Sequence, residues 1–205
     1  MRVLFQLVKK DFIIHKNILV IMFAALIAYM VVDISMIILG LLFSWTMTMQ
    51  VFSSDEKRQA KMLLSSLPFT RKEIVSSKYI SAILYVLLVV VTMSAGNLVI
   101  HQELPNWLHL AFVVIVSLFF VALMYPFSYK FASKYLLIAF FVGFAFYFLT
   151  VKLFVPNLND QIRNAFANIA AGGEPIYLLY AMIALVIVYC TSWLLSIKIY
   201  EKKVF

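Results

Sequence analysis

Side chains that could hold a metal ion or exchange protons are sparse in this sequence. The densest group is His101, Glu103 and His109, which brings two imidazoles and a carboxylate into one short stretch. Imidazoles and carboxylates are common zinc ligands, but this spacing matches no established ligand pattern. We therefore expect ordinary polar residues at a membrane boundary, and we predict no metal site.

Sequence motifs for catalysis are also missing. No glycine is followed by lysine, which excludes the Gly-x-x-x-x-Gly-Lys-Ser/Thr loop that cradles the phosphates of ATP. His-Glu-x-x-His and Gly-x-Ser-x-Gly, which mark common hydrolases, do not occur either. The sequence therefore predicts neither an enzyme nor a cofactor bound by this chain.

The long apolar segments contain almost no ionisable residues, and Asp33 and Lys152 lie near their boundaries. A proton-coupled or sodium-coupled carrier needs such groups along its pathway. We therefore expect the energy for any transport to come from outside this chain.

The composition is that of an integral membrane protein. Apolar residues make up 65% of the 205 residues, charged residues make up 13%, and the mean hydropathy is +1.01. A soluble domain is typically about 45–50% apolar. The net charge of +8 comes from basic residues beside the apolar segments, which favours orientation in an anionic bilayer over a nucleic-acid partner. Cys190 is the only cysteine, so there is no disulfide framework.

One long polar stretch, residues 53–79, interrupts the apolar sequence. It carries six basic residues: Lys57, Arg58, Lys61, Arg71, Lys72 and Lys78. Short loops rich in Lys and Arg stay on the cytoplasmic side of a membrane. We therefore place this stretch in the cytosol.

The first half of this stretch reads as a short helix. Ser53 and Glu56 fit the capping box in which two helix-start N–H groups are satisfied reciprocally, and Pro68 ends the pattern. We expect a helix over about residues 54–66, which is amphipathic and too short to be stable alone in water. It must dock either on lipid headgroups and neighbouring spans or on a soluble partner.

The second half begins a longer helix. Thr70 and Glu73 form a second capping box. We expect this helix to start near Arg71 and to run on into the next membrane span.

The segments before the polar stretch predict an interfacial helix and two spans. Residues 1–17 gather basic side chains on one face, as in a helix that lies along the headgroups. The apolar run 18–52 is too long for one crossing of a hydrocarbon core about 30 Å thick. We predict two spans, about 18–32 and 36–52, with Asp33 in an external turn, and a re-entrant hairpin as the alternative.

Four further spans follow. Spans three and four lie within 80–127, and we expect a kink or helix stop at Pro126. The fifth span is residues 135–155 and the sixth is residues 176–197. Residues 156–175 are placed outside. The fifth span is rich in phenylalanine and offers weak candidates for a substrate pathway, although packing against lipid and neighbouring helices is the favoured reading: Phe140, Phe144 and Tyr147.

The distribution of basic residues supports this topology. With six spans, 15 of the 17 Lys and Arg residues fall on the cytoplasmic side, and only Lys152 and Arg163 fall outside. The fold class predicted is therefore all-α and membrane-embedded, with six transmembrane helices and both termini in the cytosol.

The central polar stretch also resembles a known family. The run Asp55-Glu56-Lys57, then Leu67-Pro68-Phe69-Thr70-Arg71, then Ser77-Lys78-Tyr79 resembles the first cytoplasmic loop of small bacterial ABC-2 type permeases. Among these, small permeases of peptide exporters, such as the phenol-soluble modulin exporter, are similar.

This resemblance implies a permease subunit of a bacterial ABC exporter. Two permease chains, identical or paralogous, would form the pathway in the plasma membrane, and two separate cytoplasmic ATPase subunits would bind ATP and magnesium. Residues 55–66 would be the coupling helix and residues 1–17 the elbow helix. The resemblance assigns ATPase contacts to Asp55, Glu56, Lys57, Arg58, Lys61, Met62 and Leu63.

Two other classes of function remain open on the sequence. A self-contained channel or secondary carrier would transport without an ATPase, against which the scarcity of intramembrane charge counts. A scaffold or immunity protein would bind a peptide without exporting it. If the chain is part of an exporter, we expect its substrate to be an amphipathic or hydrophobic molecule, such as a peptide toxin or an antimicrobial peptide.

Overall fold

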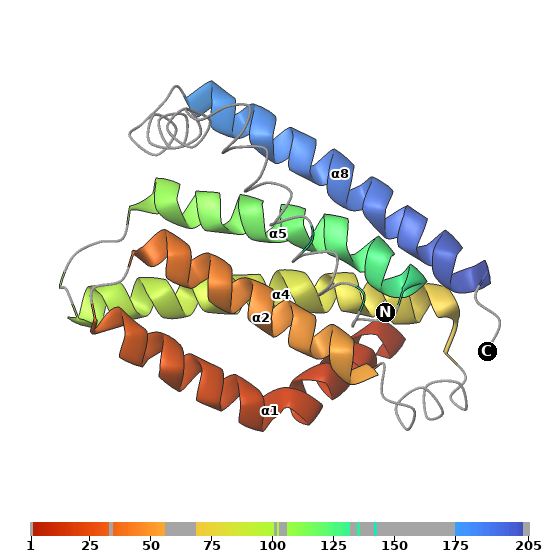
Figure 1. The fold of residues 1–205 in the computed structure, drawn as a ribbon, viewed down its shortest axis with the longest axis horizontal. Coiled ribbons are helices and arrows are strands. Elements are labelled where there is room, and N and C mark those ends of the chain that lie inside the picture. Colours follow the sequence, from red (N-terminus) through yellow and green to blue (C-terminus); the bar gives the residue numbers. More distant parts are fainter. Residues whose placement is uncertain are drawn as a thin grey trace.

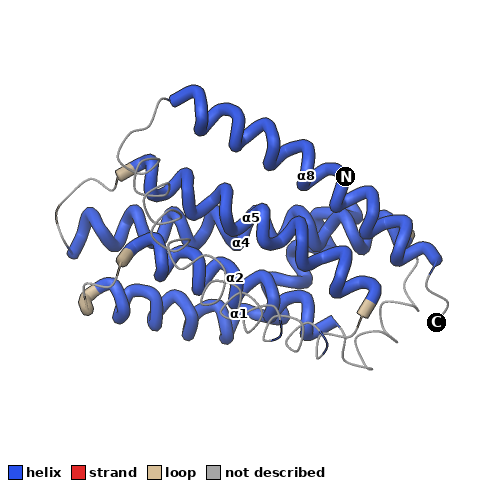
Figure 2. Tube along the Cα trace, turned by 45° about the horizontal axis from the view of Figure 1, so that its top comes forward, coloured by secondary structure: helices blue, strands red, loops and turns tan. Residues whose placement is uncertain are grey.

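The computed structural model describes residues 2–32, 35–55, 69–100, 102, 106–131, 135, 142 and 175–202. This part of the chain is helical apart from short turns (Figures 1 and 2). Its five helices are α1 (Arg2–Met30), α2 (Met36–Asp55), α4 (Arg71–Ile100), α5 (Trp107–Lys130) and α8 (Pro175–Lys202). The predicted all-α fold class is confirmed for these residues.

Helix α4 lies at the centre of the bundle and packs against each of the other four helices (Figure 1). Helix α1 runs parallel to α4, so that Asp11 meets Lys78 near one end and Met30 meets Gly96 near the other. Helices α5 and α8 pack side by side along the opposite flank, antiparallel to α4.

Four of these helices are long and apolar enough to cross a membrane. They are α4 and α5 over their whole lengths, α1 from Leu4 and α8 from Leu179. Helix α2 has a shorter apolar part, Met36–Gln50. Large apolar side chains point outward along these helices, among them Ile14, Ile21 and Val91. Such a surface suits lipid and not water, so the chain is a multi-pass membrane protein.

Five of the six predicted spans coincide with a helix of the structure. The predicted fifth span, 135–155, and the predicted external segment, 156–175, lie almost entirely outside the described residues. The count of six spans therefore stays a prediction.

The structure differs from the prediction at two helix boundaries. The interfacial helix and the first span form one continuous helix, α1, and no proline or glycine interrupts it at the predicted boundary near residue 17. Helix α1 instead bends along its length (Figure 1). At Pro126 a kink or a helix stop was predicted; helix α5 continues through Pro126 to Lys130, which excludes the stop, and the kink stays a prediction.

The second difference concerns the predicted capping box at Ser53. Helix α2 extends to Asp55, so Ser53 lies inside a helix and does not start one. Nothing in the sequence between Gly40 and Pro68 forces a break, and helix ends are the least well determined feature of a sequence pattern. The predicted helix over 54–66 therefore overlaps α2 at Ser54 and Asp55, and its remaining residues lie outside the described part of the chain.

The basic residues of the described helices lie toward one end of the bundle. They occupy the first half of α1, the first turns of α4 and the last turns of α5 and α8: Arg2, Lys9, Lys10, Lys16, Arg71, Lys72, Lys78, Lys130, Lys198 and Lys202. Figure 1 shows these helix ends close together, on the side of the bundle where α4 begins. We call this side the basic end.

The close packing of α2 against α4 and α5 depends on Gly40 in α2. A Cβ at this position would lie 2.8 Å from Val113 Cγ1 and 2.9 Å from Met93 Sδ. A Cβ at Gly96 would meet only the flexible end of Met30, at 2.7 Å from its sulfur. Glycine thus lets α2 approach both α4 and α5.

The first prediction follows from this difference. Gly40→Ala should destabilise the protein by about 1–3 kcal/mol, because branched Val113 is stiff and the helices must separate. Gly96→Ala, the matched control, should cost less because Met30 can change rotamer. Thermal unfolding of both variants in detergent measures the difference, and an equal or larger loss for Gly96→Ala would refute this packing argument.

Candidate functional site

The first turn of α4, which follows the predicted coupling segment 55–66 after a few residues, is capped by Thr70 and Glu73. The Thr70 N–H donates to Glu73 Oε2 over 2.9 Å, and the Thr70 hydroxyl donates to the same oxygen over 2.8 Å. The Glu73 N–H donates back to Thr70 Oγ1 over 3.3 Å. The predicted second capping box and the start of the helix at Arg71 are confirmed. This cap fixes where the polar stretch becomes rigid helix.

A second prediction tests the cap. Thr70→Ala should cost about 1 kcal/mol of stability, because it removes the side chain that satisfies the Glu73 N–H. Thr92→Ala is the matched control, since the Thr92 hydroxyl donates only to Leu88 O within the same helix. Unfolding midpoints in detergent should fall for Thr70→Ala and stay nearly unchanged for Thr92→Ala. Equal midpoints for the two variants would show that the cap contributes nothing.

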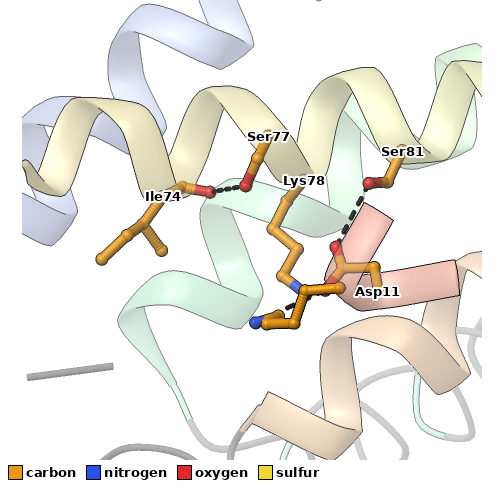
Figure 3. Close-up of polar contacts among 6 residues, drawn as sticks. Asp11, Ile74, Ser77, Lys78 and Ser81 are labelled. Carbon is orange, nitrogen blue, oxygen red and sulfur yellow. Dashed lines mark hydrogen bonds and ion pairs between the residues drawn. The ribbon is translucent and has the colours of Figure 1, made fainter. Parts of the chain in front are cut away.

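A buried ion pair joins this part of α4 to α1 (Figure 3). Lys78 Nζ lies 2.9 Å from Asp11 Oδ1, and the Ser81 hydroxyl donates to Asp11 Oδ2 over 3.2 Å. Asp11 is 1% exposed and Lys78 is 3% exposed. Lys10 is a more distant neighbour, 3.5 Å from Asp11 Oδ1, and its side chain is 29% exposed. Both carboxylate oxygens are thus paired by groups from α4.

Buried apolar residues surround the Asp11–Lys78 pair, so that separating the two charges costs free energy. Leu7 and Val8 lie beside Asp11 on the buried face of α1, and Ile74 and Val75 lie a turn before Lys78. Removing one partner of a buried pair leaves an uncompensated charge, which typically costs about 3–5 kcal/mol. The pair therefore holds α1 and α4 in one relative position.

Neutral hydrogen bonds join the same part of α4 to α8. The Tyr79 hydroxyl lies 2.8 Å from both Ser192 Oγ and Ser196 Oγ, which are one helical turn apart. The Tyr189 hydroxyl donates to Tyr79 O over 2.8 Å, and Trp193 Nε1 donates to Ser76 Oγ over 3.1 Å. Helices α4 and α8 are thus linked by hydroxyl and indole groups.

The last turn of α8 is bound by the first residue of α4. Arg71 Nη1 donates to Tyr200 O over 3.2 Å and to Glu201 O over 2.7 Å. The last carbonyls of a helix have no partner within it and carry a partial negative charge, which a guanidinium complements. The C-terminal end of α8 therefore lies beside the point where the polar stretch enters α4.

Helix α5 completes this arrangement. The rings of Tyr79 and Tyr125 meet edge to face, with centroids 5.1 Å apart, and Ser192 Oγ donates to Ala122 O. Residues from α1, α4, α5 and α8 thus converge within three turns of the start of α4. We call this set of contacts the junction.

The predicted contact residues fall mostly outside the described part of the chain. Asp55 is the last residue of α2, and the predicted contacts from Glu56 to Leu63 are not among the described residues. The weak pathway candidates Phe140, Phe144 and Tyr147 also lie outside them. Their assignments stay predictions.

Sequence reasoning missed the role of Asp11 and Lys78. One signal was available, because Asp11 is the only acidic residue before Asp33. It also falls four residues after Leu7 and four before His15, on a buried face of α1 that the sequence had not revealed. An acid on an apolar helical face predicts a partner of opposite charge.

The described residues contain no group of three or more His, Cys, Asp or Glu side chains that could hold a metal ion. His109 lies in the first turn of α5, while His101 and Glu103 lie outside the described residues.

Comparison with known protein families gives a match. The model of a family described as ABC-2 family transporter protein matches residues 6–201, which is nearly the whole chain. The comparisons with curated proteins and with solved structures gave no match.

Proposed function

The chain belongs to the ABC-2 transporter family, and from this premise we propose that it is the permease subunit of a bacterial ABC exporter. The observation that carries the proposal is the family match over residues 6–201. The apolar helices α1, α4, α5 and α8 support it, since a permease must cross the membrane. Membership also associates the chain with a separate ABC ATPase, because the family supplies the membrane subunit of such transporters.

In this proposal, residues 55–66 dock on the ATPase subunit, which binds ATP and magnesium. Glu56, Lys57, Arg58 and Lys61 supply polar contacts, and Met62 and Leu63 anchor the helix through apolar contacts. The position of the junction supports this assignment, because any displacement of the segment reaches the rigid start of α4 within a few residues. Two ATPase subunits and a second permease chain, identical or paralogous, complete the exporter.

The proposed topology has six spans with both termini in the cytosol of a bacterial plasma membrane. The gathering of described Lys and Arg residues at the basic end supports this orientation, because positively charged segments are retained on the cytoplasmic side. The proposed cargo is an amphipathic or hydrophobic molecule, such as a peptide toxin or antimicrobial peptide. Its support is the likeness of the central loop to peptide exporters and the phenylalanine-rich segment 135–155.

The test is purification of the tagged chain in mild detergent from its native host, followed by identification of the proteins that accompany it. We expect an ABC ATPase subunit in stoichiometric amount. Purification of the chain alone, with transport intact in liposomes that lack ATP, would favour a channel or secondary carrier. Capture of a peptide without any ATPase would favour an immunity or scaffold protein.

A further inference from the structure

One face of the first half of α1 combines exposed lysines with large exposed apolar side chains. Phe5, Lys9, Ile13 and Lys16 follow one another at intervals of three or four residues, which places them on one side of the helix, and we call them the lysine stripe. All four residues are exposed, Phe5 to 71% and Ile13 to 55%. Water solvates Lys9 and Lys16 well but not Phe5 and Ile13, so this face suits a partner that is both charged and apolar.

The lysine stripe lies in a part of the sequence that is nearly free of negative charge. Asp11 is the only acidic residue before Asp33, and it is 1% exposed, on the opposite and buried face of α1. There its carboxylate accepts from Lys78 Nζ over 2.9 Å and from the Ser81 hydroxyl over 3.2 Å. No exposed acidic residue of α1 offsets the positive charge of the stripe, which therefore favours an anionic partner.

The length of α1 places the stripe at the membrane surface. Its 29 residues span about 43 Å at about 1.5 Å per residue, against a hydrocarbon core about 30 Å thick. Residues 20–30 carry no charge, so the excess of about nine residues belongs at the basic start of α1. With α1 close to the membrane normal, the hydrocarbon then begins near Asp11. Lys9 lies among the lipid headgroups, and the long side chain of Lys16 reaches back toward them from about 8 Å deeper.

We propose that the lysine stripe binds anionic phospholipids of the cytoplasmic leaflet. Lys9 and Lys16 contact the lipid phosphates, and Phe5 and Ile13 lie at the boundary between headgroups and acyl chains. A lipid fits this face better than an acidic protein surface, because the stripe belongs to a helix that is itself long and apolar enough to cross the membrane, Leu4–Met30. Phosphates bound along α1 hold this span at one depth in the bilayer. The inference goes beyond the proposed function and does not require an ATPase.

Spin-labelled lipids test the lysine stripe directly. The tagged chain, with any subunits that accompany it, is reconstituted in phosphatidylcholine vesicles that contain a trace of spin-labelled phosphatidylglycerol or of spin-labelled phosphatidylcholine. Electron paramagnetic resonance measures the fraction of each label that the protein immobilises. Lys9→Gln with Lys16→Gln removes both positive charges of the stripe. Lys198→Gln with Lys202→Gln, at two exposed positions of α8, is the matched control.

We expect the wild-type protein to immobilise more of the phosphatidylglycerol label than of the phosphatidylcholine label. This preference should fall roughly twofold or more in Lys9→Gln with Lys16→Gln, because two attractive charges are lost while the label averages over all lipid contacts. It should persist in the α8 control and in Lys9→Arg with Lys16→Arg, which keeps both charges. High salt should weaken it in the wild type, since salt screens exposed charges.

Three results would overturn the inference. A wild type without preference for phosphatidylglycerol would show that no anionic lipid is selected. Equal losses in the two glutamine variants would assign the attraction to the basic end as a whole. An unchanged lipid preference in Lys9→Gln with Lys16→Gln, together with loss of an accompanying subunit, would show that the stripe contacts protein. The label measurement needs no ATPase, so a failure of the proposed function is detected separately, in the proteins that accompany the chain.

Discussion

Lys78→Met should be among the most damaging single substitutions in this protein. It leaves the carboxylate of Asp11 buried with the Ser81 hydroxyl and with Lys10, whose Nζ lies 3.5 Å away and whose side chain is 29% exposed. An uncompensated buried charge typically costs about 3–5 kcal/mol, a large share of the roughly 5–15 kcal/mol that stabilises a folded protein. We expect a large fall in the yield of monodisperse protein and in its unfolding temperature in detergent.

The double variant Asp11→Leu with Lys78→Met separates the charge effect from packing. Replacing both partners by apolar residues of similar size is often nearly neutral, so the double variant should recover most of the lost stability. Lys72→Met is the matched control, because Lys72 is exposed one turn and a half earlier in the same helix. A double variant no more stable than Lys78→Met would show that the loss does not come from the stranded charge.

Charge reversal in the predicted coupling segment should have the second large effect. Glu56→Lys combined with Arg58→Glu should reduce the ATPase recovered with the tagged chain by tenfold or more, because charge-assisted contacts to a partner are each worth roughly 1.5–3 kcal/mol. Met62→Asp should act similarly by placing a charge in an apolar groove. Quantification of the ATPase against the permease in the purified complex measures both.

Lys72→Glu serves as the control for this second prediction. It reverses an exposed charge at the same basic end but lies in α4, beyond the segment proposed to dock. ATPase recovery should therefore fall much less for Lys72→Glu than for the reversal of Glu56 and Arg58. Equal losses would indicate general electrostatic attraction in place of a docked helix, and unchanged recovery for every variant would remove these residues from the interface.

Much of the fold could be predicted because its signals are local. A run of apolar residues long enough to cross a bilayer identifies a membrane helix wherever it occurs. The start of α4 was predicted correctly because Thr70 and Glu73 form a reciprocal cap within four residues. The basic end could be predicted because Lys and Arg residues near the ends of membrane spans are retained on the cytoplasmic side, whatever the detailed packing of the helices.

The predictions failed where one local sequence pattern is compatible with two different structures. Basic residues in 1–17 suit an interfacial helix, yet nothing in the sequence separates it from the first span, and α1 is continuous. Ser53 resembles a helix start, but serine is also tolerated inside a helix such as α2. In both cases the choice depends on neighbouring helices that the local sequence does not specify.

The junction could not be predicted because its contacts span long stretches of sequence. Asp11 and Lys78 are 67 residues apart, and Tyr79 and Ser192 are 113 residues apart. In the sequence, Lys78 reads as one more basic residue of a cytoplasmic loop. Only the parallel packing of α1 on α4 shows that it neutralises a buried carboxylate.

The most direct measurement of the central claim is ATP hydrolysis by the complex purified through the tagged chain. Wild type is compared with a variant in which residues 55–66 are scrambled and the Asp11–Lys78 pair is retained. We predict that the wild-type preparation contains an ATPase subunit and hydrolyses ATP, and that the scrambled variant stays folded but loses both. A wild-type chain that purifies without an ATPase and transports in its absence would contradict the account.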